Sequence, residues 1–109
     1  MTVADLQNAL LIKTAYEGMN LSKTVTGCYT GDMLSSVLKH AKPGNVWLTV
    51  VNNPNTVAVA MLRGLSCIIM CEGVKPTADA LKAALEKKIP ILLTNKTAYQ
   101  LAVEIGKVI

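Results

Sequence analysis

Short apolar segments alternate with amphipathic segments along most of the chain. The segment VWLTVV is apolar on both faces of an extended chain except at Thr49, which is typical of a central parallel strand covered by helices on both sides. SCIIM and ILLT have the same character, whereas LLIKTAY and TVTGCYTG contain more polar residues or glycines. The predicted strands are residues 10–16, 24–31, 46–51, 66–70 and 91–94.

Outside these strands, apolar residues recur at the i, i+3, i+4 spacing of amphipathic helices. Most of these segments follow a residue that caps helices well, and Pro54 suits a first turn. In residues 78–89 the predicted inward stripe includes Leu81, Ala84 and Leu85. The predicted helices cover residues 3–9, 33–41, a segment that starts at 54 or 56 and ends at about 65, residues 78–89 and the segment after residue 97. The predicted N-caps are Thr2, Asp32, Asn53 or Asn55, and Thr77.

From Asp32 onward, helices and strands alternate strictly. Such alternation requires right-handed crossovers and a mainly parallel sheet with helices on both faces. Only a few polar residues separate the first two predicted strands, so one of them can run antiparallel at an edge of the sheet. The predicted fold class is α/β, with a three-layer α/β/α architecture, a mainly parallel five-stranded sheet and a single domain over residues 1–109.

The composition is typical of a well-packed globular domain. Hydrophobic residues make up 51% of the chain and charged residues 17%, which favours a filled core over disorder. The net charge of +4 comes from scattered basic residues, so a small anionic ligand is favoured and nucleic-acid binding is not expected. No apolar run approaches the roughly 20 residues of a membrane span. The N-terminal sequence has an acid at Asp5 and no basic start, so a secretory signal is not expected either.

Three cysteines, Cys28, Cys67 and Cys71, have no paired spacing of the kind that binds metal ions. An odd number of thiols suits a reducing compartment, and we therefore expect a cytoplasmic location. Cys67 and Cys71 are expected to be small core residues. The alternative interpretation is a thiol-based redox sensor at Cys71.

Three polar corners follow the predicted strands, at residues 52–56, 71–77 and 94–97. In open parallel sheets, ligands bind outside the carboxyl ends of the strands, where hydroxyl, amide and backbone donors can hold a phosphate or carboxylate. The same residue types also form caps and turns, so capping alone is the alternative reading. The candidate ligand-binding residues are Asn52, Asn53, Asn55, Thr56, Gly73, Thr94, Asn95 and Thr97.

No catalytic constellation is evident in the sequence. The phosphate-binding motif G-x-x-x-x-G-K-[ST] is absent, and the single histidine, His40, is predicted at an exposed helix end. We therefore expect no enzyme activity, no cofactor and no metal. A competing hypothesis is a phosphotransfer accessory that uses Asp32, Ser35 or Thr94.

The helix after Asn53 is apolar on nearly every side until Arg63. Because a sheet covers only one stripe of a helix, burial must also come from neighbouring helices or from another subunit. Both readings remain open from the sequence. The candidate oligomer contacts are Val57, Val59, Ala60 and Met61.

The chain resembles the DRTGG domains, in the group similar to the N-terminal domain of HPr kinase/phosphorylase. The resemblance spans about residues 2–109. Where that family has an Asp-Arg turn and then Thr-Gly-Gly, this sequence has Asn53-Pro54-Asn55 and Cys71-Glu72-Gly73, so the last glycine is retained. The matching runs include Thr26-Gly27-Cys28-Tyr29, Asp32-Met33-Leu34-Ser35, Val57-Ala58-Val59-Ala60 and Ile89-Pro90-Ile91-Leu92.

The resemblance implies a fold like that of the HPr kinase N-terminal domain and a non-catalytic regulatory or scaffold role. Similar domains are joined to phosphotransacetylase, to CBS-containing pyrophosphatases and to HPr kinase, and they commonly lie at oligomer contacts. We therefore expect a homodimer that senses a small anionic metabolite or nucleotide at the carboxyl ends of its strands. The alternative is an accessory subunit of a phosphotransfer system (serine kinase or phosphotransacetylase-related) or of a hydrogenase-associated enzyme system.

Overall fold

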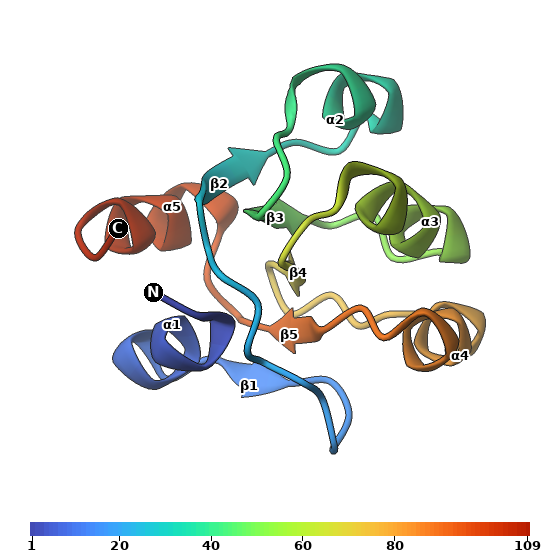
Figure 1. Ribbon diagram of the computed structural model, residues 1–109, viewed down its shortest axis with the longest axis horizontal. Coiled ribbons are helices and arrows are strands. Elements are labelled where there is room, and N and C mark those ends of the chain that lie inside the picture. Colours follow the sequence, from blue (N-terminus) through green and yellow to red (C-terminus); the bar gives the residue numbers. More distant parts are fainter.

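The computed structural model describes residues 1–109 as a sheet between two layers of helices (Figure 1). The five strands lie in the order β1-β5-β4-β3-β2; β1 is antiparallel to β5 and the other pairs are parallel. The α/β fold class is therefore confirmed, including the antiparallel edge strand. The elements are α1 (Val3–Leu10), β1 (Lys13–Thr14), β2 (Gly27–Thr30), α2 (Leu34–His40), β3 (Asn45–Thr49), α3 (Pro54–Arg63), β4 (Cys67–Met70), α4 (Ala78–Lys87), β5 (Ile91–Leu93) and α5 (Ala98–Gly106).

The two faces of the sheet have separate hydrophobic cores. Helices α1 and α5 cover one face, and α2, α3 and α4 cover the other (Figure 1). Successive residues of β3 show why both faces are apolar: Trp47 belongs to the α2–α4 core, whereas Val46 and Leu48 belong to the α1–α5 core. None of the helices combines the length and the apolar character needed to cross a bilayer.

Local capping explains most of the helix starts. The Thr2 hydroxyl accepts a hydrogen bond from the Asp5 backbone N–H, and the Asp5 carboxylate accepts one from the Thr2 N–H, which completes a capping box. Asn53 caps α3 with Pro54 in the first turn, and Thr77 caps α4 as predicted. Thr97 begins α5 through a second capping box.

The prediction that Asp32 caps the second helix was wrong. Met33 occupies the N-cap position of α2 and makes no side-chain cap hydrogen bond. The Asp32 carboxylate instead accepts hydrogen bonds from the Thr49 hydroxyl and the Val50 N–H at the end of β3. The neighbouring strand therefore supplies the donors that the sequence pattern assigned to the helix.

The predicted strand over residues 10–16 is too long. Helix α1 continues through Leu10, and Leu11 ends it in the left-handed conformation at φ 53°. Only Lys13 and Thr14 pair with β5.

The prediction that Leu85 lies on the inward stripe of α4 was also wrong, because its side chain is 56% exposed.

The apolar helix α3 is covered within the chain by α2 and α4 as well as by the sheet. Val57, Val59 and Ala60 have side chains that are at most 6% exposed. These three residues therefore cannot serve as oligomer contacts, because a second subunit could reach them only if the helix layer opened. Met61 is 42% exposed and stays available for such a contact.

Candidate functional site

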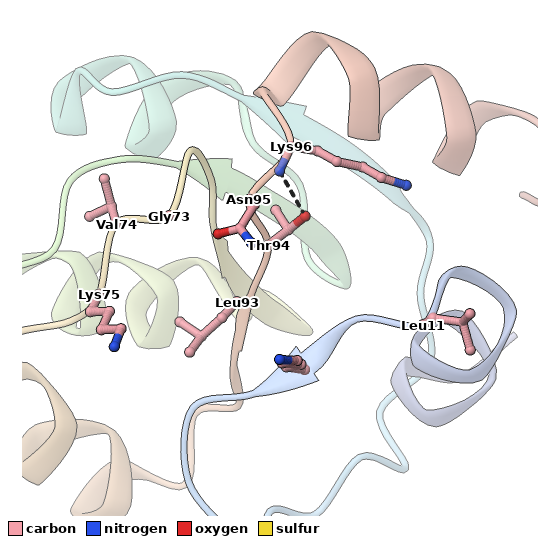
Figure 2. Close-up of a pocket in the computed structure, with 9 residues that line it drawn as sticks. Leu11, Gly73, Val74, Lys75, Leu93, Thr94, Asn95 and Lys96 are labelled. Atoms are coloured by element: carbon pink, nitrogen blue, oxygen red, sulfur yellow. Dashed lines mark hydrogen bonds between the residues drawn. The ribbon is translucent and has the colours of Figure 1, made fainter.

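A pocket of about 450 Å³ lies at the carboxyl ends of β4 and β5. Its walls are the loop from β4 to α4, the loop from β5 to α5, and the segment that leads from α1 into β1 (Figure 2). The lining contains three lysines, three aliphatic residues and three small or polar residues, which are Lys13, Lys75, Lys96, Leu11, Val74, Leu93, Gly73, Thr94 and Asn95.

Backbone hydrogen bonds join the two loops that form the pocket. The Glu72 N–H donates to the Lys96 carbonyl at 2.9 Å, and the Gly73 N–H donates to the Thr94 carbonyl at 3.0 Å. The Lys96 N–H donates to the Thr94 hydroxyl. These three amides are therefore hydrogen-bonded between and within the loops, and they are not free to bind an anion, contrary to the prediction from the sequence.

Gly73 lies where the two loops pack against each other. Its φ of +74° lies in the left-handed region, and an added Cβ atom would stand 3.3 Å from the Asn95 side-chain oxygen. Glu72 also has a positive φ, and the Val74 N–H donates to the Cys71 carbonyl, which closes a tight turn. A glycine at position 73 lets this turn pack against the β5–α5 loop without strain.

The positive charge of the pocket comes from its lysine side chains. Lys13 lies on β1 in register with Leu93 of β5, so the antiparallel pairing brings it beside the loops. Lys96 forms the one salt bridge of the protein, with Glu104 of α5 at 2.6 Å, and both side chains are partly exposed. Lys13 and Lys75 have no carboxylate within salt-bridge distance. The lining thus carries two uncompensated positive charges and a third that is weakly paired.

Residues 5–108 match the DRTGG domain family. The chain belongs to this family. A similar solved structure is that of the CBS and DRTGG domains of the regulatory region of Clostridium perfringens pyrophosphatase, complexed with its activator diadenosine tetraphosphate. The TM-score is 0.67 at 12% identity, over 94% of this chain and 44% of that one, so the likeness shows the shared fold. Among curated protein sequences, none is significantly similar to this chain.

Three of the eight predicted ligand residues line the pocket of this DRTGG domain: Gly73, Thr94 and Asn95. Asn52 supports the pocket from outside, since its side-chain amide donates to the Lys75 carbonyl at 2.8 Å and its own carbonyl accepts from the Thr77 N–H.

The other four predicted residues stabilise helix starts, as the capping reading proposed. Asn53 and Thr97 are N-caps, and the N–H of Asn55 donates to the Asn53 side chain. Thr56 is buried, and its hydroxyl donates to the Val51 carbonyl. None of these four residues lines the pocket of the DRTGG domain.

Five of the lining residues were not predicted from the sequence: Leu11, Lys13, Val74, Lys75 and Lys96. A signal was present for three of them, because Val74, Lys75 and Lys96 lie within the polar corners at residues 71–77 and 94–97. No local signal places Leu11 and Lys13 there, since their position depends on the pairing of β1 with β5.

The buried thiols of the DRTGG domain do not fit a redox sensor. Cys67 and Cys71 are fully buried in the α1–α5 core. Burial raises the pKa of Cys67 to about 12 and that of Cys71 to about 11. Redox-active thiols need an accessible site and a lowered pKa.

A second pocket, of about 360 Å³, lies near the amino end of β5. It is formed by the Tyr16–Asn20 segment, the end of α4 and Pro90, and the Tyr16 hydroxyl donates to the Ile89 carbonyl beside it. Lys88 is its one charged lining residue.

Nowhere in the protein do three His, Cys, Asp or Glu side chains lie close enough together to hold a metal ion.

Proposed function

We propose that this chain is a non-catalytic regulatory domain that binds a small anionic metabolite or nucleotide in the pocket between the β4–α4 and β5–α5 loops. The observation that carries the proposal is the convergence of Lys13, Lys75 and Lys96 on one pocket at the carboxyl ends of parallel strands. Three chain segments distant in sequence supply these charges. Their mutual repulsion is relieved when an anion binds among them.

The similar regulatory region of the pyrophosphatase supports a regulatory role, because that protein is complexed with a nucleotide activator. The fold that the two proteins share is compatible with a domain that responds to small molecules. Two residues of a type that catalysis often uses do not form a catalytic group here. The Asp32 carboxylate accepts a hydrogen bond from Thr49, and His40 is exposed at the end of α2, outside the pocket.

Occupancy of the pocket can be transmitted through Asn52. This residue is hydrogen-bonded to Lys75 and Thr77 of the pocket loop and immediately precedes the Asn53 cap of α3. A ligand that fixes the β4–α4 loop therefore also fixes the start of α3. On the outer surface of α3, Met61 and Leu62 are 42% and 70% exposed.

We propose that this outer surface of α3 is the contact of a homodimer. Exposed aliphatic side chains on one helix gain free energy when a second copy covers them. The alternative is that this domain associates with an enzyme partner in a phosphotransfer or hydrogenase-associated system. A regulatory domain without its own reaction needs an enzyme to regulate.

Calorimetric titration with nucleotides and small phosphorylated metabolites tests the anion site. Lys75→Ala is expected to weaken binding about tenfold, because one charge-assisted contact is worth about 1.4 kcal/mol. Lys39→Ala, which removes a lysine of α2 outside the pocket, is the matched control and should bind as the unaltered protein does. Equal affinities of the two variants would contradict the proposal.

A further inference from the structure

Leu11 combines two features that do not favour folding. It ends α1 in the left-handed conformation at φ 53°, and its side chain is 87% exposed. A residue with a Cβ atom costs about 1 kcal/mol in this conformation relative to glycine. An exposed leucine gains almost nothing from burial in return. The residue lies on the wall of the lysine-lined pocket.

Leu11 belongs to the aliphatic part of that wall. The other two aliphatic lining residues, Val74 and Leu93, are half-buried. Figure 2 shows Leu11 on one side of the pocket and Val74 with Lys75 on the other, with Leu93 and Thr94 between them. A molecule seated over Leu93 therefore meets aliphatic surface and lysine side chains in the same pocket.

We propose that the pocket recognises an organic phosphate, in which a phosphoryl group binds the lysines and an apolar or heteroaromatic body packs on Leu11, Val74 and Leu93. This inference rests on the proposed function and specifies the class of its ligand. Leu11 is the specificity-determining residue. Its side chain leaves water when the body of the ligand covers it, and inorganic phosphate has no such body.

The test is calorimetric titration of the unaltered protein and of Leu11→Gly with inorganic phosphate, AMP and hexyl phosphate. Covering about 50 Å² of aliphatic surface corresponds to a five- to tenfold gain in affinity, so both organic phosphates are expected to bind the unaltered protein about that much more tightly than inorganic phosphate. Leu11→Gly is expected to lose most of this gain, because Leu11 is the most exposed of the three aliphatic lining residues, and to keep its affinity for inorganic phosphate. Without ligand, Leu11→Gly should unfold at a higher temperature, because glycine accepts the left-handed conformation.

Lys88→Gly is the matched control. Lys88 ends α4 in the same conformation at φ 57° and does not line this pocket. It should likewise raise the unfolding temperature, and it should leave all three affinities unchanged.

The outcomes separate this inference from the proposed function. If Leu11→Gly binds both organic phosphates as tightly as the unaltered protein does, the inference is overturned and the anion site stands. The same conclusion follows if its affinity for inorganic phosphate falls by the same factor as its affinities for the organic phosphates. If none of the three probes binds the unaltered protein, the anion site itself is contradicted. If only AMP binds more tightly than inorganic phosphate, the result supports a nucleotide as the ligand. If AMP and hexyl phosphate both bind more tightly, the result supports apolar packing in general.

Discussion

The Asp32 carboxylate accepts a hydrogen bond from the Thr49 hydroxyl at 2.8 Å. Thr49 is 2% exposed at the end of β3, and the same carboxylate oxygen accepts the Val50 N–H at 3.0 Å. Asp32 follows β2, so this contact joins the carboxyl ends of two adjacent strands. It holds the edge strand β2 in its parallel register with β3.

Asp32→Ala is expected to lower the free energy of unfolding by about 1–3 kcal/mol, because a buried hydroxyl and a backbone N–H lose their acceptor. Urea denaturation measures the difference. Asp32→Asn keeps a side-chain oxygen at the same place and should lose less than half as much. Equal losses in the two variants would show that charge, rather than hydrogen bonding, makes the contribution.

Gly73→Ala is expected to destabilise the protein by about 1–2 kcal/mol, because alanine is strained at positive φ and its Cβ atom would press on the Asn95 side chain. Thermal unfolding monitored by circular dichroism measures this loss. Gly106→Ala serves as the control, since nothing lies within 4 Å of the added methyl group at the end of α5. It should leave stability unchanged or slightly higher.

The buried thiols predict a loss of stability at alkaline pH. Burial raises the pKa of Cys67 to about 12 and that of Cys71 to about 11, from 9.0. At pH 8 and below, both thiols are almost fully protonated in the folded and unfolded states, so their stabilisation is fully present. As the pH rises above 9, the unfolded state loses protons first, and stability falls by about 1 kcal/mol per thiol by pH 10. Urea denaturation at pH 8 and pH 10 measures the fall.

The doubly substituted protein Cys67→Ala, Cys71→Ala separates this effect from general alkaline unfolding. The alanine cavities lower stability by a similar amount at both pH values. The difference between pH 8 and pH 10 should therefore shrink by about 2 kcal/mol. An unchanged difference would mean that other groups cause the alkaline loss.

Glu104→Gln is expected to strengthen anion binding two- to fivefold, roughly the worth of an exposed ion pair, because it frees Lys96 from its carboxylate partner. Calorimetric titration of both proteins with the anion that binds the unaltered protein, at low and at high salt, measures the change in affinity. Glu86→Gln, which removes a charge from the exposed side of α4, is the control. A gain of the same size in both variants would point to net charge alone.

Leu62→Asp is expected to convert the proposed homodimer into a monomer, because a carboxylate on the outer surface of α3 loses hydration when a second copy covers it. Sedimentation at micromolar concentration measures the subunit count. Tyr99→Asp changes an equally exposed side chain on α5, on the other face of the sheet, and should leave the association unchanged. Monomeric unaltered protein would contradict the homodimer.

Local patterns were enough to predict most of the fold. The run CIIM is buried on both faces, and a short apolar run bounded by turn residues is typical of a strand in the centre of a sheet. The caps at Thr2, Asn53 and Thr77 act on backbone groups two or three residues away, so they are also visible in the sequence. Asp32 was misassigned because its partners belong to another strand, 17 and 18 residues farther along.

The candidate site was only partly predictable for the same reason. Thr94, Asn95 and Gly73 lie within three residues of the carboxyl ends of buried strands, which is where parallel sheets bind ligands. Leu11 and Lys13 reach the pocket because β1 pairs antiparallel with β5 in one particular register. Such a register follows from burial across the whole sheet, and a two-residue strand carries no pattern that reveals it.

The sequence by itself determined the order of helices and strands, the layers they form and the edge of the sheet at which polar loops gather, because each depends on hydrophobic period and capping over a few neighbouring residues. The tertiary structure decided which side chains share the pocket, that three lysines rather than backbone amides provide its charge, and that α2 and α4 cover α3. These outcomes depend on contacts between residues far apart in the chain, and folding selects them together.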